Sequence, residues 1–580
     1  MSTVASVRAK RRPRRRRLLR RLVPVAALCF PAVLLFGVEP AAAFPQLQST
    51  GSSFAGVAID QWVGQATSLY GFNINFEVSS SVFGLNSFAQ GQEDFAASDI
   101  PYSSGQADST PSQPYQYLPD VAGALAFMYN LQGSNGQQIR NLVLNAQTLD
   151  GIFTGKITYW DDPSIKNLNP PNVALNLPHT VIVPVYREDA SGENYLLSDY
   201  LLHQDGSTFQ AYQHAVADSQ AGQPSATWPL SQTGPPSGYP NYTSLTGQNG
   251  SDGVANYVSA LSSEGSIGYL ETAYAIQHNF PVASLVNASG NAVQPTSVND
   301  ATALEKAILF ADLTQNLANV YSNPLPNAYP VSAYSYLVAP CNPSLAAAQK
   351  FNCAGPQGTS PFTNDRGNEL GQFIAFMACA GQEKMALLGY SPLPPNLVQE
   401  DFNAVGRLNG GVQPPAPTAA NCHNPYVDGE VPLPGGGAGP TIDTSVADAN
   451  SAAAIAAANQ AAASKATLGA GTSGPAGSST SGGATGSTTA GGGSSDAVSD
   501  RSGGTGSRSG GSSSDLGNEY KNFDALQELA DRSRGPSIVP VLLWCLILAV
   551  VLLGPPLGWL AWRRRRSGKG GAGLLPGATA

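Results

Sequence analysis

Three short polar turns of this 580-residue chain carry groups that can bind an anion. Residues 49–54 (STGSSF) and 79–81 (SSS) are rich in hydroxyl groups, and residues 187–194 (REDASGEN) begin with Arg187. Each turn comes just before an apparent helix, whose N-terminus offers free N–H groups and a partial positive charge. A single turn of this kind is usually only a helix cap. Three in one chain, one with an arginine that can donate two parallel hydrogen bonds, favour a site for a desolvated oxyanion.

An acid, Asp99 in the segment 94–101 (DFAASDIP), is a further candidate for this site. An ionised carboxylate only accepts hydrogen bonds, so it suits an anion that carries its own proton, such as hydrogen phosphate. It would repel fully ionised sulfate and leave an unpaired buried charge. The alternative interpretation is that Asp99 caps a turn or a helix.

Arginine is scarce in the part of the chain that we expect to be globular, which contains Arg140, Arg187, Arg366 and Arg407. Only Arg187 lies at a turn between an apparent strand and a helix, so it is the best single candidate for a charged ligand of the anion. The sequence has no GxSxG or HExxH motif, and its five histidines share no metal-ligand spacing. We therefore expect no catalytic residue, metal ion or cofactor.

Strand-like and helix-like segments alternate between residues 44 and 411, which predicts an α/β protein. Alternation with period two predicts a strand at 72–78, and an apolar run predicts a buried strand at 181–185. Apolar residues at helical spacing predict helices over residues 54–70, 194–202, 301–317 and 371–388. About 370 residues are too many for one core, so we expect two lobes.

The two ends of the chain are predicted to be a signal peptide and a membrane anchor. Residues 1–43 contain a basic region, a short apolar core and an Ala triplet, which is typical of a secretory signal cleaved after Ala43. An uncleaved signal anchor is the alternative. Residues 537–562 include an uncharged run long enough to span a bilayer, and four arginines follow it. Because positive residues stay on the cytoplasmic side, we predict a single-pass protein of the cell membrane, with an extracellular binding domain and a cytoplasmic tail at 563–580.

The chain between these ends is acidic. Ten of the 30 Lys and Arg lie in residues 1–21 and five follow Trp562, which leaves 15 against 38 of the 39 acids and a net charge of −23. Such a surface argues against nucleic acid as a partner. Residues 412–536 are rich in Pro, Gly, Ser and Ala, and we predict that they form a disordered linker between the domain and the membrane.

Four cysteines lie in the part of the chain predicted to be exported, where disulfides persist. They allow three pairings. We favour the short loop Cys341–Cys353 together with the pair Cys379–Cys422.

Six segments carry a resemblance to a known family: STGSSFAG at 49–56, DFAASDIP at 94–101, GIFTGKITYWDDPSIKNLNP at 151–170, YREDASGENY at 186–195, GSDGVANYV at 250–258 and GSIGYLETAYA at 265–275. From about Gln48 to Leu408 the chain resembles the phosphate-binding proteins that serve phosphate ABC importers. The resemblance implies an α/β fold of two lobes, a type II periplasmic-binding-protein-like clamp that closes on the anion. Lobe 1 would comprise about 44–128 and 280–411, and lobe 2 about 129–279.

The resemblance also implies the ligands of phosphate, which fall on Ser53, Phe54, Ser81, Asp99, Arg187, Ser191 and Gly192. Asp189 matches the acid that pairs with the site arginine and orients it. The family has Thr where this chain has Glu193, whose backbone N–H could still donate. The carboxylate would repel phosphate if it pointed inward. Either it turns outward as an acid at the start of a helix, or the ligand is not simple phosphate.

The sequence therefore predicts a monomeric binding protein, not an enzyme, that captures inorganic phosphate and delivers it to ABC permease subunits. One alternative is a membrane-tethered surface protein that uses the same fold for sensing or adhesion, or that binds a different small oxyanion. A phosphatase or another hydrolase is disfavoured because the sequence lacks the corresponding motifs.

Overall fold

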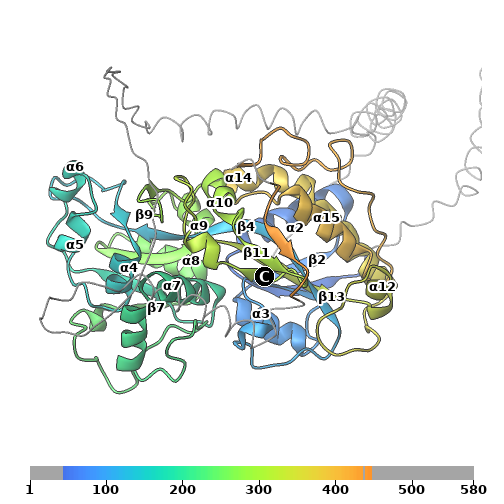
Figure 1. Cartoon of the computed structure of the whole chain (residues 1–580), viewed down its shortest axis with the longest axis horizontal. Coiled ribbons are helices and arrows are strands. Elements are labelled where there is room, and N and C mark those ends of the chain that lie inside the picture. The colour runs from blue at the N-terminus through green and yellow to red at the C-terminus, as the bar shows by residue number, and fades with distance from the viewer. Residues whose placement is uncertain (1–43, 435–437, 447–580) are drawn as a thin grey trace, which may run out of the picture. The chain divides into compact units, whose positions relative to one another are not determined.

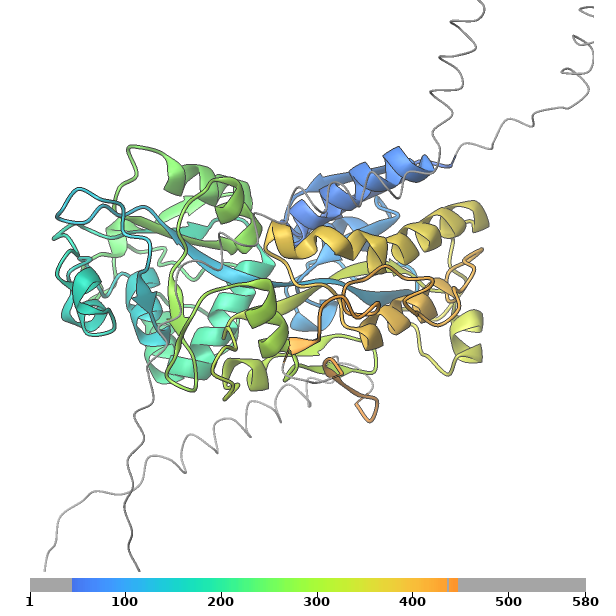
Figure 2. The same ribbon diagram turned by 90° about the horizontal axis from the view of Figure 1, so that it is seen from above.

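The computed structural model describes residues 44–434 and 438–446. Figures 1 and 2 show two lobes: a first lobe around α2, α3 and β13, and a second lobe around α4 to α8. One eight-stranded sheet runs through both, in the order β2-β1-β3-β13-β4-β8-β6-β7. Its strands are β1 Leu47–Gly51, β2 Ile74–Val78, β3 Phe95–Ser98, β4 Tyr115–Tyr129, β6 Val183–Arg187, β7 Thr246–Gln248, β8 Ser266–Glu271 and β13 Ser332–Pro340.

Two three-stranded sheets lie beside the main one, in the orders β10-β9-β5 and β12-β11-β14. Their strands are β5 Val143–Leu144, β9 Ser284–Val286, β10 Ala292–Val293, β11 Ile308–Phe310, β12 Gln315–Asn316 and β14 Thr441–Asp443. The α-helices are α2 Gly56–Tyr70, α3 Ser81–Ala89, α4 Ala146–Phe153, α5 Pro163–Lys166, α6 Pro171–Ala174, α7 Gly192–Ala215, α8 Gly250–Ser259, α9 Thr272–Gln277, α10 Ser297–Leu304, α11 Ala318–Tyr321, α12 Pro343–Ala348, α13 Asn364–Ala378, α14 Met385–Leu388 and α15 Pro395–Val405. Short 3₁₀ turns occupy Tyr102–Ser104, Tyr242–Ser244 and Ala380–Lys384.

Strand β4 connects the two lobes. Its residues up to Ala124 pair with β13 of the first lobe, whereas Leu125 to Tyr129 pair with β8 of the second. Every residue of β4 is buried. A strand that is buried on both faces reads as a nearly continuous apolar run, as this one does. The lobes therefore share one strand as a common backbone.

Both faces of the first-lobe sheet are apolar, because successive side chains of a strand point to opposite sides. Ala97 and Leu337 contribute to one buried cluster with Trp62 of α2. Their neighbours Ala96 and Tyr336 contribute to a second cluster with Leu85, Phe88 and other residues of the α3 side. Helices must cover both faces to bury these clusters, which confirms the predicted α/β class.

Helix α2 shows why the chain forms these elements. Its buried positions include Ala58, Ile59, Trp62 and Ala66, which follow the helical period of three and four residues. The helix ends at Gly71, whose φ of 75° lies in the left-handed region that glycine adopts without strain. The helix predicted over residues 54–70 is thus confirmed within two residues.

The cysteine prediction is also confirmed. Disulfides join Cys341 to Cys353 and Cys379 to Cys422. All four cysteines are buried.

The helix predicted over residues 301–317 is wrong beyond Leu304, where α10 ends. The chain then forms the antiparallel hairpin of β11 and β12. Leu313, between the two strands, has a φ of 70°, a left-handed conformation that a helix cannot include. The apolar residues of β11 fit a strand as well as a helix, so their spacing alone does not decide.

Two predicted boundaries also differ from the structure. Strand β9, at Ser284–Val286, pairs with β5 inside the second lobe, although we assigned the chain from about residue 280 to lobe 1. The predicted linker starts too early at residue 412, because β14 pairs with β11 and Cys422 bonds to Cys379. Asn424 is buried and donates to the carbonyl oxygens of Ala378 and Leu393. A few anchoring residues hold this Pro- and Gly-rich segment on the domain, which average composition does not reveal.

The predicted signal peptide, most of the linker, the membrane helix at 537–562 and the tail at 563–580 lie outside the described residues. Within residues 44–434 and 438–446, no helix is long and apolar enough to cross a membrane.

Candidate functional site

The candidate site lies where strands of both lobes end. Strands β1, β2 and β3 are parallel, so the residues that follow them meet at one edge of the sheet. Gly51 ends β1 in close contact with β3, and a Cβ there would lie 2.0 Å from the carbonyl oxygen of Ala97. This approach brings Ser52 and Asp99 together. Arg187, at the end of β6, is brought to the same place from the second lobe.

Asp99 is buried and accepts hydrogen bonds from hydroxyls on two elements. Ser52 donates to both carboxylate oxygens at 2.6 and 2.8 Å, and Ser81 donates to Oδ2 at 2.8 Å. Ser80, the neighbour of Ser81, instead caps α3 and accepts from the N–H of Phe83. Burial, together with the nearby negative charge of Glu193, raises the pKa of Asp99 to about 7.

Arg187 is completely buried and is oriented by Asp189, as the sequence predicts. Its Nε donates to Asp189 Oδ1 at 2.8 Å, and its Nη2 forms an ion pair with Oδ2. The N–H of Gly250 donates to the same Oδ1 at 3.0 Å. Burial alone would lower the pKa of Arg187, but the charges of Glu193 and Asp189 outweigh it and hold the pKa above its usual value. The guanidinium is therefore a fixed positive charge with Nη1 directed into the site.

The turn that follows Arg187 is held by one amide side chain. Asn194 Nδ2 donates to the carbonyl oxygens of Arg187, Asp189 and Ala226, at 3.0, 3.1 and 2.8 Å. Its Oδ1 accepts a short hydrogen bond from the hydroxyl of Tyr269. These bonds fix the backbone between β6 and α7 and so position the arginine.

Glu193 points inward, into the cluster of donors. Its Oε1 lies 2.6 Å from Arg187 Nη1 and accepts from the hydroxyls of Ser53 at 2.9 Å and Ser251 at 2.7 Å. Arg187 Nη1 also donates to Ser53 Oγ at 2.9 Å. The residue is fully buried, and its Oε2 has no hydrogen-bond partner among the described residues. Of the two orientations predicted for Glu193, the outward one is therefore wrong.

Gly192 lies at a close contact between the lobes. A Cβ at this position would lie 2.3 Å from Asp99 Oδ2 and 2.7 Å from Ser81 Oγ. Only a residue without a side chain allows α7 of the second lobe to approach the first lobe so closely. The lobes are closed on each other in this structure.

Two predicted site residues have other partners here. Ser191 caps α7, accepting from the N–H of Asn194 at 3.2 Å. The N–H of Phe54 donates to Ser52 Oγ at 3.0 Å, while its carbonyl oxygen accepts from Tyr390 at 2.6 Å. Both residues are buried near Arg187 and Glu193, but none of these hydrogen bonds involves Arg187 or Glu193.

Sequence reasoning missed Ser52 and Ser251. Ser52 stands in the first hydroxyl-rich turn, so a signal for it was present. Ser251 is the second residue of the segment GSDGVANYV, whose start forms the N-terminus of α8. The small polar start of that segment was a signal of the same kind, although its distance from Arg187 along the chain hides their contact.

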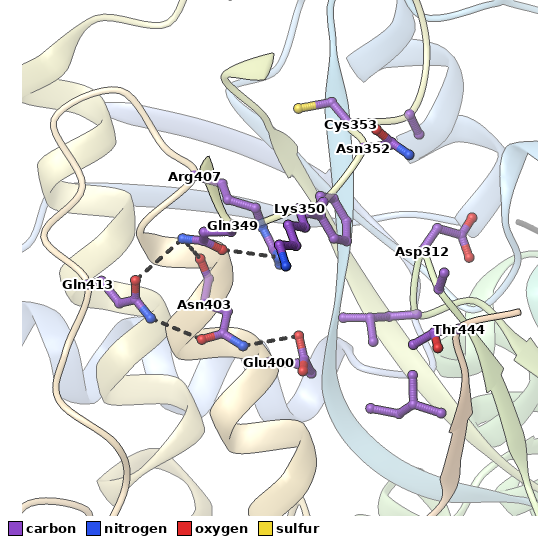
Figure 3. A pocket seen from close by; sticks show the side chains of 15 residues that line it. Asp312, Gln349, Lys350, Asn352, Cys353, Glu400, Asn403, Arg407, Gln413 and Thr444 are labelled. Atoms are coloured by element: carbon purple, nitrogen blue, oxygen red, sulfur yellow. Dashed lines mark hydrogen bonds between the residues drawn. The ribbon is translucent and has the colours of Figure 1, made fainter. Parts of the chain in front are cut away.

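A separate cavity of about 590 Å³ lies elsewhere in the domain, between the β14 segment, the chain around Cys353 and α15. Figure 3 shows hydrogen-bonded amides on one wall, from Gln349, Asn403 and Gln413, with Asp312 and Thr444 on the other side. None of the residues around Arg187 lines it. Lys350 and Arg407 line the same cavity, and Nη2 of Arg407 has no hydrogen-bond partner among the described residues.

A family model described as a PBP superfamily domain matches residues 38–379, more than half of the chain. The chain belongs to this superfamily. This agrees with the predicted periplasmic-binding-protein-like α/β fold. The match covers all residues of the Arg187 and Asp99 clusters.

Curated phosphate-binding proteins are similar to this chain over most of their own length. The phosphate-binding protein PstS of Methanocaldococcus jannaschii is 27% identical over 62% of this chain and 86% of its own. The phosphate-binding protein PstS 2 of Mycobacterium tuberculosis is 26% identical over 63% of this chain and 87% of its own. Among solved structures, a phosphate-binding protein from Stenotrophomonas maltophilia is 19% identical, with a TM-score of 0.42, over 68% of this chain and all of its own.

Proposed function

We propose that this protein is an extracytoplasmic solute-binding protein that captures inorganic phosphate and delivers it to an ABC importer. The observation that carries the proposal is the convergence of three donors on one oxygen. Arg187, Ser53 and Ser251 all donate to Glu193 Oε1, beside the buried acceptor Asp99. An oxyanion oxygen in a desolvated site requires several hydrogen-bond donors at short distance, and these three groups supply them.

The acceptor favours phosphate over other oxyanions. Asp99 lies within the same closed cleft, and a phosphate that keeps a proton can donate to it. Sulfate has no proton at neutral pH, so it could not donate to this buried carboxylate and would be repelled by its charge. The names of the curated relatives, which are phosphate-binding proteins, support the same ligand.

The proposed mechanism is closure without chemistry. Ser53, Phe54, Ser81 and Asp99 belong to the first lobe, and Arg187, Ser191 and Gly192 to the second, so a bound anion would be held from both sides. Opening of the lobes admits the ion, closure removes it from water, and docking on ABC permease subunits releases it. Nothing in this cycle makes or breaks a covalent bond, so the protein acts as a carrier and not as an enzyme. We propose that the carrier is a monomer.

The site residues would have distinct roles. Arg187 supplies the positive charge, and Asp189 fixes its orientation. Ser53, Ser81 and Ser191 supply hydroxyls, and the backbone N–H groups of Phe54 and Gly192 would turn to the anion.

The same proposal includes a membrane tether, which lies outside the described residues. The uncharged run within residues 537–562 and the arginines after it support a single-pass anchor with the domain outside the cell. A linker that starts after residue 446 would let the domain move near an importer and raise its local concentration there. If a chain truncated after residue 536 and cleaved after Ala43 stays with the membrane fraction, this anchor is refuted.

Calorimetric titration of the full chain with inorganic phosphate tests the proposal, with sulfate as the matched control. We expect saturable one-to-one binding of phosphate below millimolar concentration and sulfate affinity at least about 100-fold weaker, because a wrong partner leaves a buried charge unpaired. Absence of phosphate binding at millimolar concentration, or equal affinity for sulfate, would contradict it.

The inward position of Glu193 favours a second candidate. If its carboxylate is never displaced, the closed domain holds no external anion, and the protein would serve as a membrane-tethered surface protein for sensing or adhesion. The same titration separates the two, since this candidate predicts no phosphate binding at any concentration.

A further inference from the structure

Glu193 binds hydrogen-bond donors that could also bind an external oxyanion. Its Oε1 accepts from Arg187, Ser53 and Ser251 at 2.6 to 2.9 Å. A carboxylate and a phosphate prefer the same donors, and an arginine binds either one. The internal carboxylate therefore occupies Arg187 and Ser53, two of the donors that the proposed function assigns to phosphate.

Each nitrogen of the Arg187 guanidinium already has a partner among the described residues. Nε and Nη2 of Arg187 are bonded to Asp189, and Nη1 is bonded to Ser53 and Glu193. The charge balance also opposes a second anion. Arg187 pairs with Asp189 and Glu193, and the charge of Glu193 also acts on Asp99, so an added phosphate would meet like charges in a desolvated site.

The contacts of Glu193 cross the cleft. The residue belongs to α7 of the second lobe, and Ser53 lies at the start of α2 in the first lobe. On the second-lobe side, Arg187 and Ser251 hold the same carboxylate oxygen. A bound phosphate would connect the lobes through the same groups, and Glu193 already does so without one.

We propose that Glu193 is a built-in occupant of the anion site, which closes the lobes without ligand and which phosphate must displace in order to bind. The part that concerns phosphate rests on the proposed function, whereas the closure does not. Glu193 thereby sets the phosphate concentration at which the protein fills, because the energy of displacing it is subtracted from the energy of binding. A chain with Thr at this position would fill at lower concentration.

Hydrogen exchange on the full chain without phosphate tests the closure. In Glu193→Thr and in the shape-conserving Glu193→Gln, we expect amides of residues 52–56 and 192–195 to exchange at least about tenfold faster than in the wild type. The matched control is Glu188→Thr, because Glu188 is an exposed acid next to Arg187 and is not in the cluster. Unchanged exchange in both Glu193 variants would overturn the proposal.

Titration of the same variants with inorganic phosphate tests the displacement. We expect Glu193→Thr to bind about 100-fold more tightly than the wild type, Glu193→Gln to lie between them, and Glu188→Thr to equal the wild type. Phosphate should also restore slow exchange in Glu193→Thr. If the wild type binds phosphate and neither Glu193 variant binds it more tightly, the displacement is refuted and the proposed function stands.

A third outcome concerns the ligand alone. If exchange is faster in the Glu193 variants but no form binds phosphate at millimolar concentration, the internal latch is supported and the proposed function fails. The two measurements thus separate a wrong ligand from a wrong role for Glu193.

Discussion

Asp99 joins the electrostatics of the site to the stability of the fold. Burial, followed by the charge of Glu193, raises its pKa to about 7 from 3.8. A carboxyl group whose pKa is raised in the folded state binds more protons there than in the unfolded chain between these two values. Its contribution therefore destabilises the fold increasingly as the pH rises from about 4 to about 7, and the effect is complete above that range.

We predict that Asp99→Asn removes this pH dependence. Relative to the variant, the wild type should lose up to about 4 kcal/mol of unfolding free energy between pH 4 and pH 7, at about 1.4 kcal/mol for each pH unit. Urea unfolding of the full chain at several pH values in this range measures the difference. Two parallel curves would show that Asp99 titrates at its ordinary pKa in the folded protein.

The sequence predicts which residues form the site better than it predicts the direction in which each side chain points. Arg187 pairs with Asp189 as the resemblance implies, and Ser81 donates to Asp99, because these residues lie at or just after strands whose ends are fixed by the fold. The direction of Glu193 was not predictable, since α7 could present an acid at its first turn to solvent as well as to the cleft. Only the position of the other lobe, with Ser53, decides it.

The contact between α7 and the end of β3 is the element that controls closure. Gly192 has no positive φ, so alanine would not strain the backbone and would favour the helix. Its Cβ, however, would overlap Asp99 of the other lobe. Alanine should thus prevent closure without damaging the second lobe itself.

We predict that Gly192→Ala destabilises the closed domain by about 1–3 kcal/mol and weakens phosphate binding at least about tenfold. Gly206→Ala is the matched control, because Gly206 lies in the same helix with open space around its Cβ position. Thermal unfolding and calorimetry measure the two effects. Equal behaviour of the two variants would mean that the lobes close without the Gly192 contact.

The stabilisation expected from each disulfide grows with the logarithm of the number of residues in the loop that it closes. Cys379–Cys422 spans 43 residues and holds the segment before β14 on the domain, whereas Cys341–Cys353 spans 12. Loop entropy predicts that replacing the first pair by serines costs about 4 kcal/mol and the second about 3 kcal/mol. Chemical unfolding of the two double variants tests this order. A larger loss from the shorter loop would contradict it.

Among the elements, α2 was predictable and the hairpin of β11 and β12 was not. The apolar residues of α2 recur at helical spacing on one face, and a glycine in the left-handed conformation marks the end of the helix. Residues 301–317 instead join a helix and two short strands, and β14, distant in the sequence, completes their sheet. Long-range pairing of this kind leaves no local pattern to read.

The described part of the chain consists of two lobes that share β4 and meet at the Arg187 cluster. The two-lobed arrangement could be predicted from length and from family resemblance. The sequence did not show that β9 belongs to the second lobe or that the folded domain extends to residue 446. Those depend on pairings across the fold. Contact between the lobes brings the hydroxyl of Ser53 to the buried Arg187, and capture of an anion there is the central claim.

Equilibrium dialysis of the full chain against radiolabelled inorganic phosphate tests this claim most directly when the wild type is compared with Arg187→Gln. Arg140→Ala is the matched control, because Arg140 is exposed and lies outside the site. We predict that Arg187→Gln loses at least about 100-fold in affinity, since a buried charge-assisted contact is removed, and that Arg140→Ala binds like the wild type. Retained phosphate binding by Arg187→Gln would show that the anion, if bound at all, is held somewhere else.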